Sequence, residues 1–239
     1  MGAHSTNSEH IRGFLKGNTF LGRLPDSALA SLMDRGQLRQ YAKRDFIYRR
    51  GEPGDSLMVV VKGRIKLTNV NVGGKEVVLH FLVPGNIYGE IAAMDGKERA
   101  ANAVALEDSD VFLIYTRDLM PTLKAYPDAM LEVITALCEK VRAGAAMLED
   151  STLEMRARVA RGLLRLARQH GQKGVEGICV QLALSQGELG NYLGLSRPNV
   201  SRQLGQLKEA NVIKIDSTQI VITDEEGLTD IADAASAKD

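Results

Sequence analysis

Short apolar segments separated by turn signals dominate the chain between about residues 37 and 115. The segments have strand length and are rich in β-branched and aromatic residues, which favour strands. They cover residues 46–48, 56–61, 65–68, 77–82, 103–105 and 111–115. Glycines lie between them, where turns with positive φ favour a residue without a Cβ. This pattern predicts a β jelly roll or small barrel within an α+β chain.

Helical periodicity replaces the strand pattern after residue 126. Pro127 and Asp128 favour a helix start, because proline suits the first turn and an acid complements the helix dipole. Apolar or small residues then recur at alternating spacings of four and three, namely Met130, Ile134, Leu137, Val141, Gly144 and Leu148. This heptad spacing predicts a dimerisation helix over residues 127–150. Packing of the same helix on its own barrel is the alternative interpretation.

The sharpest local pattern lies between residues 185 and 210. Ser185 and Glu188 have the spacing of a capping box, and Gly194 suits the end of the helix that they begin. Ser196 is the expected cap of a second helix, whose inward face is predicted to carry Val200, Leu204 and Leu207. Two short helices joined by a tight glycine turn indicate a helix-turn-helix, and a generic helical hairpin is the alternative.

The start of this second helix carries the candidate DNA contacts. They are Ser196, Arg197, Asn199, Ser201 and Arg202. An arginine can donate two hydrogen bonds to the O6 and N7 atoms of guanine, and N-terminal residues of a recognition helix reach base edges. Arg197, Ser201 and Arg202 are therefore predicted to face the bases, while Asn199 and Gln203 are expected to meet phosphates or solvent.

Charge is distributed unevenly although the net charge is zero. Residues 151–214 hold 10 basic and 4 acidic side chains, a net charge of +6, and residues 215–239 hold 1 basic and 7 acidic side chains, a net charge of −6. A basic segment favours a polyanionic partner. Two apolar runs around the turn Asp216–Thr218 predict a β-hairpin wing. The expected domains are an effector domain (1–126), the dimerisation helix (127–150) and a winged helix-turn-helix domain with an acidic tail (151–239).

Composition disfavours several other classes of protein. Cys138 and Cys179 cannot form a disulfide framework or a cysteine-rich metal site, and the four histidines are scattered, so no metal is expected. No nucleophile–base pairing or Walker-type loop is evident, so an enzyme is not expected. Charged residues interrupt every apolar run, and the first residues lack the apolar stretch of a signal peptide. The expected location is the cytoplasm, with no membrane partner.

A second group of chemistry-bearing residues extends from Gly89 to Ala101. A glycine that opens a short helix leaves backbone N–H groups free to meet an anion, and Arg99 adds a planar, permanent charge suited to phosphate. Glu90 fits beside a phosphate only if its carboxylate binds a sugar hydroxyl. Together the three residues predict a cyclic or ribose phosphate ligand. The alternative is a simple ion pair between Glu90 and Arg99.

These motifs occur in one order over about residues 12–223. The run Gly51–Asp55, the Gly89–Ala101 cassette, the long helix and the helix-turn-helix together resemble the catabolite activator / fumarate-nitrate regulator (CRP/FNR) family of bacterial transcription factors. The resemblance implies a cyclic-nucleotide-binding jelly roll, a homodimer and binding to a two-fold double-stranded DNA site. It also implies RNA polymerase as a partner and cAMP as the effector.

The resemblance assigns ligand-binding roles by position. The implied residues are Gly89, Glu90, Ile91, Arg99, Ala100, Ala101 and Lys140. Ala100 lacks the hydroxyl that usually follows this arginine in the bacterial activator, which disfavours cGMP more than cAMP. Gly144 and Ala145 stand where a Thr-Ser pair contacts adenine, and Lys140 stands where arginine is usual. Pro198 replaces a base-reading glutamate. The N-terminal cysteine cluster of iron–sulfur members is absent, which disfavours oxygen sensing by such a cluster.

The sequence therefore predicts a dimeric, sequence-specific DNA-binding transcription regulator that is controlled allosterically by a cyclic nucleotide, with cAMP as the expected effector. Two alternatives remain open. One is a regulator of the same fold with another effector or none. The other is a cyclic-nucleotide-responsive regulatory subunit that acts on a protein partner.

Overall fold

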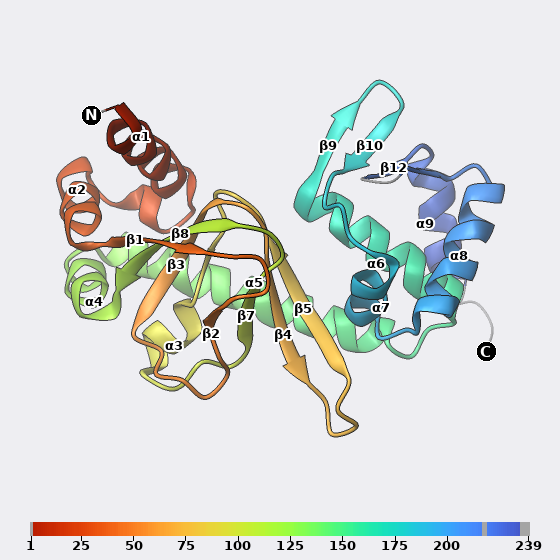
Figure 1. Cartoon of the computed structure of the whole chain (residues 1–239), viewed down its shortest axis with the longest axis horizontal. Helices are drawn as coiled ribbons and strands as arrows, with labels where there is room; N and C mark the ends of the chain where they lie inside the picture. The colour runs from red at the N-terminus through yellow and green to blue at the C-terminus, as the bar shows by residue number, and fades with distance from the viewer. Residues whose placement is uncertain (1, 217–218, 235–239) are drawn as a thin grey trace. The chain divides into compact units, whose positions relative to one another are not determined.

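The computed structural model describes residues 2–216 and 219–234 (Figure 1). The chain divides into two compact units, Met1–Arg142 and Ala143–Asp239, so the division falls inside the long helix α5 (Pro127–Asp150). Within the described residues, no helix combines the length and the apolar character needed to cross a lipid bilayer.

Two four-stranded antiparallel sheets form the centre of the first unit. One sheet has the order β1-β8-β3-β6 and the other the order β2-β7-β4-β5. The strands are β1 (Gln37–Tyr41), β2 (Phe46–Tyr48), β3 (Ser56–Lys62), β4 (Ile65–Val70), β5 (Glu76–Leu82), β6 (Ile87–Tyr88), β7 (Asn102–Ala105) and β8 (Ser109–Tyr115). The predicted jelly roll is confirmed. Strand β1 escaped prediction because most of its residues are polar and exposed, and β6 because it has only two residues.

Helices pack against these sheets and contribute to one of the two hydrophobic cores of this unit. They are α1 (Gly2–Gly17), the 3-10 helix η1 (Leu21–Arg23), α2 (Asp26–Arg35), α3 (Glu90–Asp95) and α4 (Thr116–Ala125). One core joins helices to strands through fully buried residues such as Leu15, Leu57 and Leu119. The other lies between the two sheets and includes Met58, Ile65 and Val111. The barrel is therefore filled by side chains, and its helices close the remaining apolar faces.

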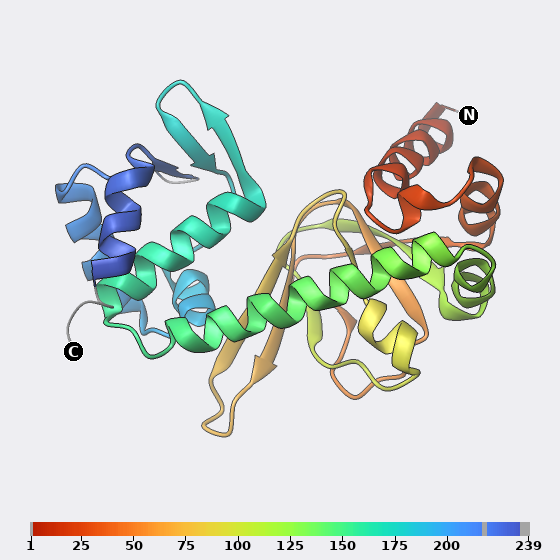
Figure 2. The same cartoon turned by 180° about the vertical axis from the view of Figure 1, so that it is seen from behind.

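Helix α5 packs one face on the barrel and exposes another. Ala129 and Val133 are fully buried in the helix-to-strand core, with Met130 and Leu137 packed against it, and the first part of α5 runs beside α3 (Figure 2). Two residues of the predicted heptad, Met130 and Leu137, therefore pack against the barrel core, as in the alternative interpretation of this helix. The exposed large apolar side chains of α5 are Leu131, Ile134, Val141 and Leu148. A heptad pattern places residues on a helix face but does not say which partner covers it.

The second unit combines the end of α5 with four further helices and a small sheet. Its elements are α6 (Met155–His170), β9 (Gly171–Gly174), β10 (Gly177–Val180), α7 (Gln186–Leu193), α8 (Arg197–Glu209), β11 (Ile213–Ile215), β12 (Ile220–Ile222) and α9 (Glu225–Asp233). The sheet has the order β11-β12-β10-β9. The predicted wing corresponds to β11 and β12, and Ser217 and Thr218 of its turn lie outside the described residues.

Local hydrogen bonds hold the turn between α7 and α8. The Glu188 N–H donates to the Ser185 hydroxyl, and the Glu188 carboxylate accepts from the Ser185 N–H, which completes the predicted capping box. Gly194 has a φ of 68°, a conformation that favours glycine, and ends α7. The Ser196 hydroxyl then caps α8 by accepting from the Asn199 N–H. The helix-turn-helix is therefore built from the residues that the sequence predicted.

Candidate functional site

The first candidate site begins at a sharp turn directly after strand β6. Gly89 follows β6 with a φ of 107° and precedes the short helix α3. A Cβ at this position would lie 2.8 Å from the Nη1 atom of Arg99 and 2.8 Å from the Ser56 carbonyl oxygen. Glycine is therefore needed for its left-handed backbone and for the close approach of Arg99.

Arg99 is a buried cation with unused hydrogen-bond capacity. Only 5% of the residue is exposed. Its Nη2 donates to the Ser56 hydroxyl over 2.9 Å, and its guanidinium carbon lies 4.3 Å from the centroid of the Tyr48 ring. The Asp55 carboxylate is 3.9 Å away, and that side chain is 70% exposed. The buried Nε and Nη1 atoms have no hydrogen-bond partner among the residues that the structure describes. Such a guanidinium is suited to bind an anion.

The long helix α5 supplies the partner of Glu90. Its carboxylate is almost completely buried and forms an ion pair with Lys140 of α5. The Lys140 ammonium also lies 3.4 Å from the centroid of the Tyr88 ring. Burial lowers the pKa of Lys140, and the nearby Glu90 carboxylate opposes this change. The partner of Glu90 is therefore Lys140, and the described residues include no Glu90–Arg99 ion pair of the kind that the alternative interpretation required.

The remaining predicted ligand-binding residues lie closer to the surface. Ile91 is 41% exposed on α3, Ala100 is exposed, and Ala101 is half-buried. The Ala100 carbonyl accepts a hydrogen bond from the Asn69 amide over 3.1 Å. Beside Arg99 lies an open cavity of about 800 Å³, whose lining includes Arg50, Gly54, Lys97 and Ala100.

Three residues of this site were missed by sequence reasoning. Ser56, Tyr48 and Tyr88 come from strands β3, β2 and β6, and two of them lie more than forty positions before Arg99. Burial raises the pKa of Tyr48 to about 12, so its phenol stays neutral near pH 7. Only Tyr88 left a signal in the sequence, because it directly precedes Gly89.

The second candidate site is the outward face of α8. Arg197, Ser201 and Arg202 are exposed, and the Arg202 Nη2 donates to the Asn199 side-chain oxygen over 3.3 Å. Ser196 is exposed at the start of the helix. The prediction that Gln203 meets phosphate or solvent is wrong, because Gln203 is only 6% exposed. It shares the inward face of α8 with the predicted core residues of that helix.

Two family models match separate parts of the chain. A cyclic nucleotide-binding domain matches residues 38–126, and a Crp-like helix-turn-helix domain matches residues 157–231. Together they cover more than half of the chain. The first match contains Gly89, Glu90 and Arg99, and the second contains α7 and α8.

Curated proteins resemble the chain over most of its length. A cyclic AMP receptor protein of Thermus thermophilus is 28% identical over 219 residues, which are 91% of this chain and 98% of the relative. A CRP-like cAMP-activated global transcriptional regulator of Mycobacterium tuberculosis is 25% identical over 203 residues, which are 84% of this chain and 91% of the relative.

Solved structures resemble the fold. FixK2 from Bradyrhizobium japonicum superposes with a TM-score of 0.73 at 24% identity, covering 82% of this chain and 96% of that chain. A transcriptional regulator of the CRP family from Thermus thermophilus has a TM-score of 0.64 at 26% identity, covering 82% of this chain and 97% of that chain.

Proposed function

The chain belongs to the CRP/FNR family of transcription regulators, and from this premise we propose that it is a homodimer whose affinity for a two-fold DNA site is controlled by cAMP. Members of the family regulate transcription and are not enzymes. The observation that carries the effector part of the proposal is the buried, incompletely partnered guanidinium of Arg99.

In the proposed cAMP site, Arg99 and Glu90 of the Gly89–Ala101 cassette bind different parts of the nucleotide. Arg99, kept in place by Ser56 and Tyr48, would bind the cyclic phosphate through Nε and Nη1. Glu90 would accept a hydrogen bond from the ribose 2′-hydroxyl. Lys140 would then have to share or release Glu90, which links the ligand to helix α5. The names of the Thermus and Mycobacterium relatives, which refer to cAMP, support this choice of nucleotide.

The proposed DNA interface is the start of α8. Arg197 and Arg202 would read base edges in the major groove, with Ser196 and Asn199 near the backbone. Residues 151–214 carry a net charge of +6, which favours association with phosphates. We further propose that the protein acts in the cytoplasm, where it would bind DNA, with RNA polymerase as a further partner.

The proposed dimer forms along the exposed apolar face of α5. Leu131, Ile134, Val141 and Leu148 are each more than half exposed, at spacings of three and seven residues. These spacings belong to one side of a helix in a coiled coil. A second copy of the chain would cover this face and would bring two α8 helices to one DNA site.

The test combines ligand titration with DNA selection. DNA that the purified protein retains from a randomised pool is sequenced, and its affinity is then measured during titration with cAMP and with cGMP. We expect a two-fold consensus whose affinity rises with cAMP and falls steeply with added salt. Arg202→Ala should relax one base of each half-site, whereas Lys208→Ala, near the end of the same helix, should not. A pool without sequence preference would refute the proposal.

Two observations favour a second candidate, a regulator of the same fold with a different effector. Gly144 and Ala145 have no side-chain group that could form a hydrogen bond with a base, and the Glu90 carboxylate already forms an ion pair with Lys140. A DNA affinity that changes with neither cAMP nor cGMP, while a two-fold consensus is retained, would support this candidate.

A further inference from the structure

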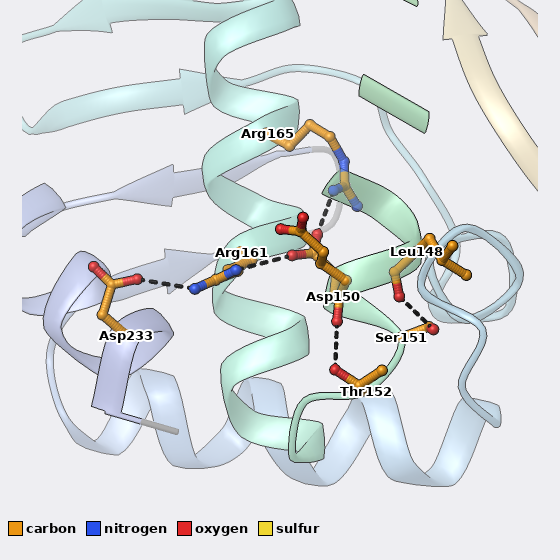
Figure 3. Close-up of polar contacts among 8 residues, drawn as sticks. Leu148, Asp150, Ser151, Thr152, Arg161, Arg165 and Asp233 are labelled. Atoms are coloured by element: carbon orange, nitrogen blue, oxygen red, sulfur yellow. Dashed lines mark hydrogen bonds and ion pairs between the residues drawn. The ribbon is translucent and has the colours of Figure 1, made fainter. Parts of the chain in front are cut away.

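A buried carboxylate ends helix α5. Asp150 is the last residue of α5, and only 8% of its side chain is exposed. Its Oδ2 atom accepts a hydrogen bond from Arg165 Nη1, and its Oδ1 atom lies 3.4 Å from Arg161 Nη1 (Figure 3). Both arginines belong to α6, so one carboxylate connects two consecutive helices.

The position of Asp150 between the two arginines has an electrostatic reason. Arg161 and Arg165 are four residues apart on α6, where like charges repel each other. Their side chains are only 29% and 17% exposed, so water cannot fully solvate the two guanidinium groups. A carboxylate between them removes the repulsion and supplies the hydrogen-bond acceptor that each group needs.

The same arginines extend the connection to the helix-turn-helix. Arg165 Nε donates to the Tyr192 hydroxyl of α7 over 2.7 Å, and its guanidinium carbon lies 5.2 Å from the centroid of that ring. Tyr192 is only 5% exposed, and burial raises the pKa of its phenol. Arg161 Nη2 donates to Asp233 of α9 over 3.2 Å (Figure 3). Asp150 is therefore connected to α6, α7 and α9 through two side chains.

The turn after α5 is closed by its own hydrogen bonds. The Ser151 hydroxyl donates to the Leu148 carbonyl over 2.6 Å, and the Thr152 hydroxyl donates to the Glu149 carbonyl over 2.8 Å. Arg158 of α6 donates to the Ser151 and Leu153 carbonyls. These bonds satisfy backbone groups that a helix end leaves free, so the turn is held on both sides. The division into compact units agrees, because it assigns residues from Ala143 onward to the DNA-binding unit.

We propose that Asp150 is a positioning residue that fixes the last turns of α5 to the DNA-binding unit. A rotation of the last turns of α5 would then move α6, α7 and α9 together, because the contacts of Asp150 hold the junction with α6. This inference rests on the proposed function, since a fixed junction matters to a protein whose long helix carries a signal to DNA.

Hydrogen exchange of the full chain tests the fixed junction without DNA or ligand. Asp150→Asn keeps the size of the side chain and removes its charge, and Asp233→Asn is the matched control on the exposed partner of Arg161. In Asp150→Asn we expect amides of residues 147–153 and of α7 to exchange about tenfold faster, with amides of the barrel unchanged. The control should exchange like the wild type. Unchanged exchange in Asp150→Asn, or equal acceleration in the control, would overturn the inference.

DNA binding separates a positioning role from a merely structural one. The probe is the DNA selected by the wild-type protein, with a scrambled duplex of equal length as reference. We expect Asp150→Asn to lose about tenfold in affinity for the selected DNA and to keep its affinity and salt dependence for the scrambled duplex. Asp150→Glu should restore part of the loss. Equal affinities of Asp150→Asn and the wild type for the selected DNA would overturn the positioning role. A wild-type protein that selects no DNA would instead refute the proposed function.

Discussion

Replacement of Arg99 by methionine should abolish the response to cAMP while changing the stability of the ligand-free protein very little. The substitution removes a buried charge whose Nε and Nη1 atoms have no partner among the described residues, and methionine fills most of the volume. Replacement of buried ion pairs by apolar side chains of similar size is often neutral or stabilising by about 1–4 kcal/mol, and we apply this range to the single buried cation. Ser56 keeps its own hydrogen bond to Asp55, so the substitution leaves no new unpaired hydroxyl.

Two losses oppose this gain. The hydrogen bond from the charged Arg99 to Ser56 contributes about 1.5–3 kcal/mol, and the contact with the Tyr48 ring contributes about 0.5–2 kcal/mol. The losses are about as large as the gain, so the stability of the ligand-free protein should change by no more than about 1 kcal/mol, which corresponds to about 2–4 °C in the melting temperature of a chain of this size.

Scanning calorimetry with and without cAMP measures both effects. A ligand at about 100 times its dissociation constant stabilises the protein that binds it by about 2.7 kcal/mol, so the wild-type transition should move up by several degrees. The transition of Arg99→Met should begin near that of the ligand-free wild type and should not move when cAMP is added. A variant that retains the cAMP shift would refute the assignment of Arg99 as the anion site.

Three further substitutions test other parts of the structure. Gly89→Ala should destabilise the protein by about 1–3 kcal/mol in urea, because the new Cβ meets the Ser56 backbone at a φ of 107°, and a wild-type midpoint would contradict the strain. Val141→Glu should change the sedimentation mass from dimer to monomer with little effect on protomer stability, since Val141 is 73% exposed, and an unchanged dimer mass would exclude this face. Burial lowers the pKa of His170 in the folded protein, so near pH 6.5 and below this side chain binds more protons in the unfolded chain than in the folded one. Stability should therefore decrease as the pH falls from about 7.5 to about 5.5, and His170→Leu should show a smaller decrease in urea titrations. A variant whose stability falls with pH as steeply as that of the wild type would contradict this.

The helix-turn-helix could be predicted almost residue by residue because its geometry depends on neighbours in the sequence. Ser185 with Glu188, Gly194 and Ser196 each act within three or four positions, and the structure has these caps where the sequence indicated them. Helix α5 likewise has the bounds that its pattern predicted. Gln203 shows the limit of this reasoning, since a polar side chain on an inward face is invisible to a rule that places polar residues outside.

The ligand site could be predicted only in part because its members come from distant segments. The Gly89–Ala101 cassette is continuous in the sequence, so the sequence alone indicated it. Ser56 and Tyr48 reach Arg99 only when β2 and β3 lie in the barrel, and no local spacing indicates that contact. Lys140 was predicted only from the family resemblance, and its ion pair with Glu90 depends on how α5 packs on α3.

The strand pairings of the two units have a consequence for the order in which the chain folds. In the barrel, β1 pairs with β8, and the paired residues Gln37 and Leu113 are 76 positions apart in the sequence. In the second unit the most distant paired residues, Ile178 and Ile222, are 44 positions apart, and its helix caps are local. Long-range pairing slows folding, because a larger loop must close before contacts are gained. The half of the protein that the ribosome makes last is therefore expected to reach its native form in the shorter time after synthesis, while the barrel sets the pace for the whole chain.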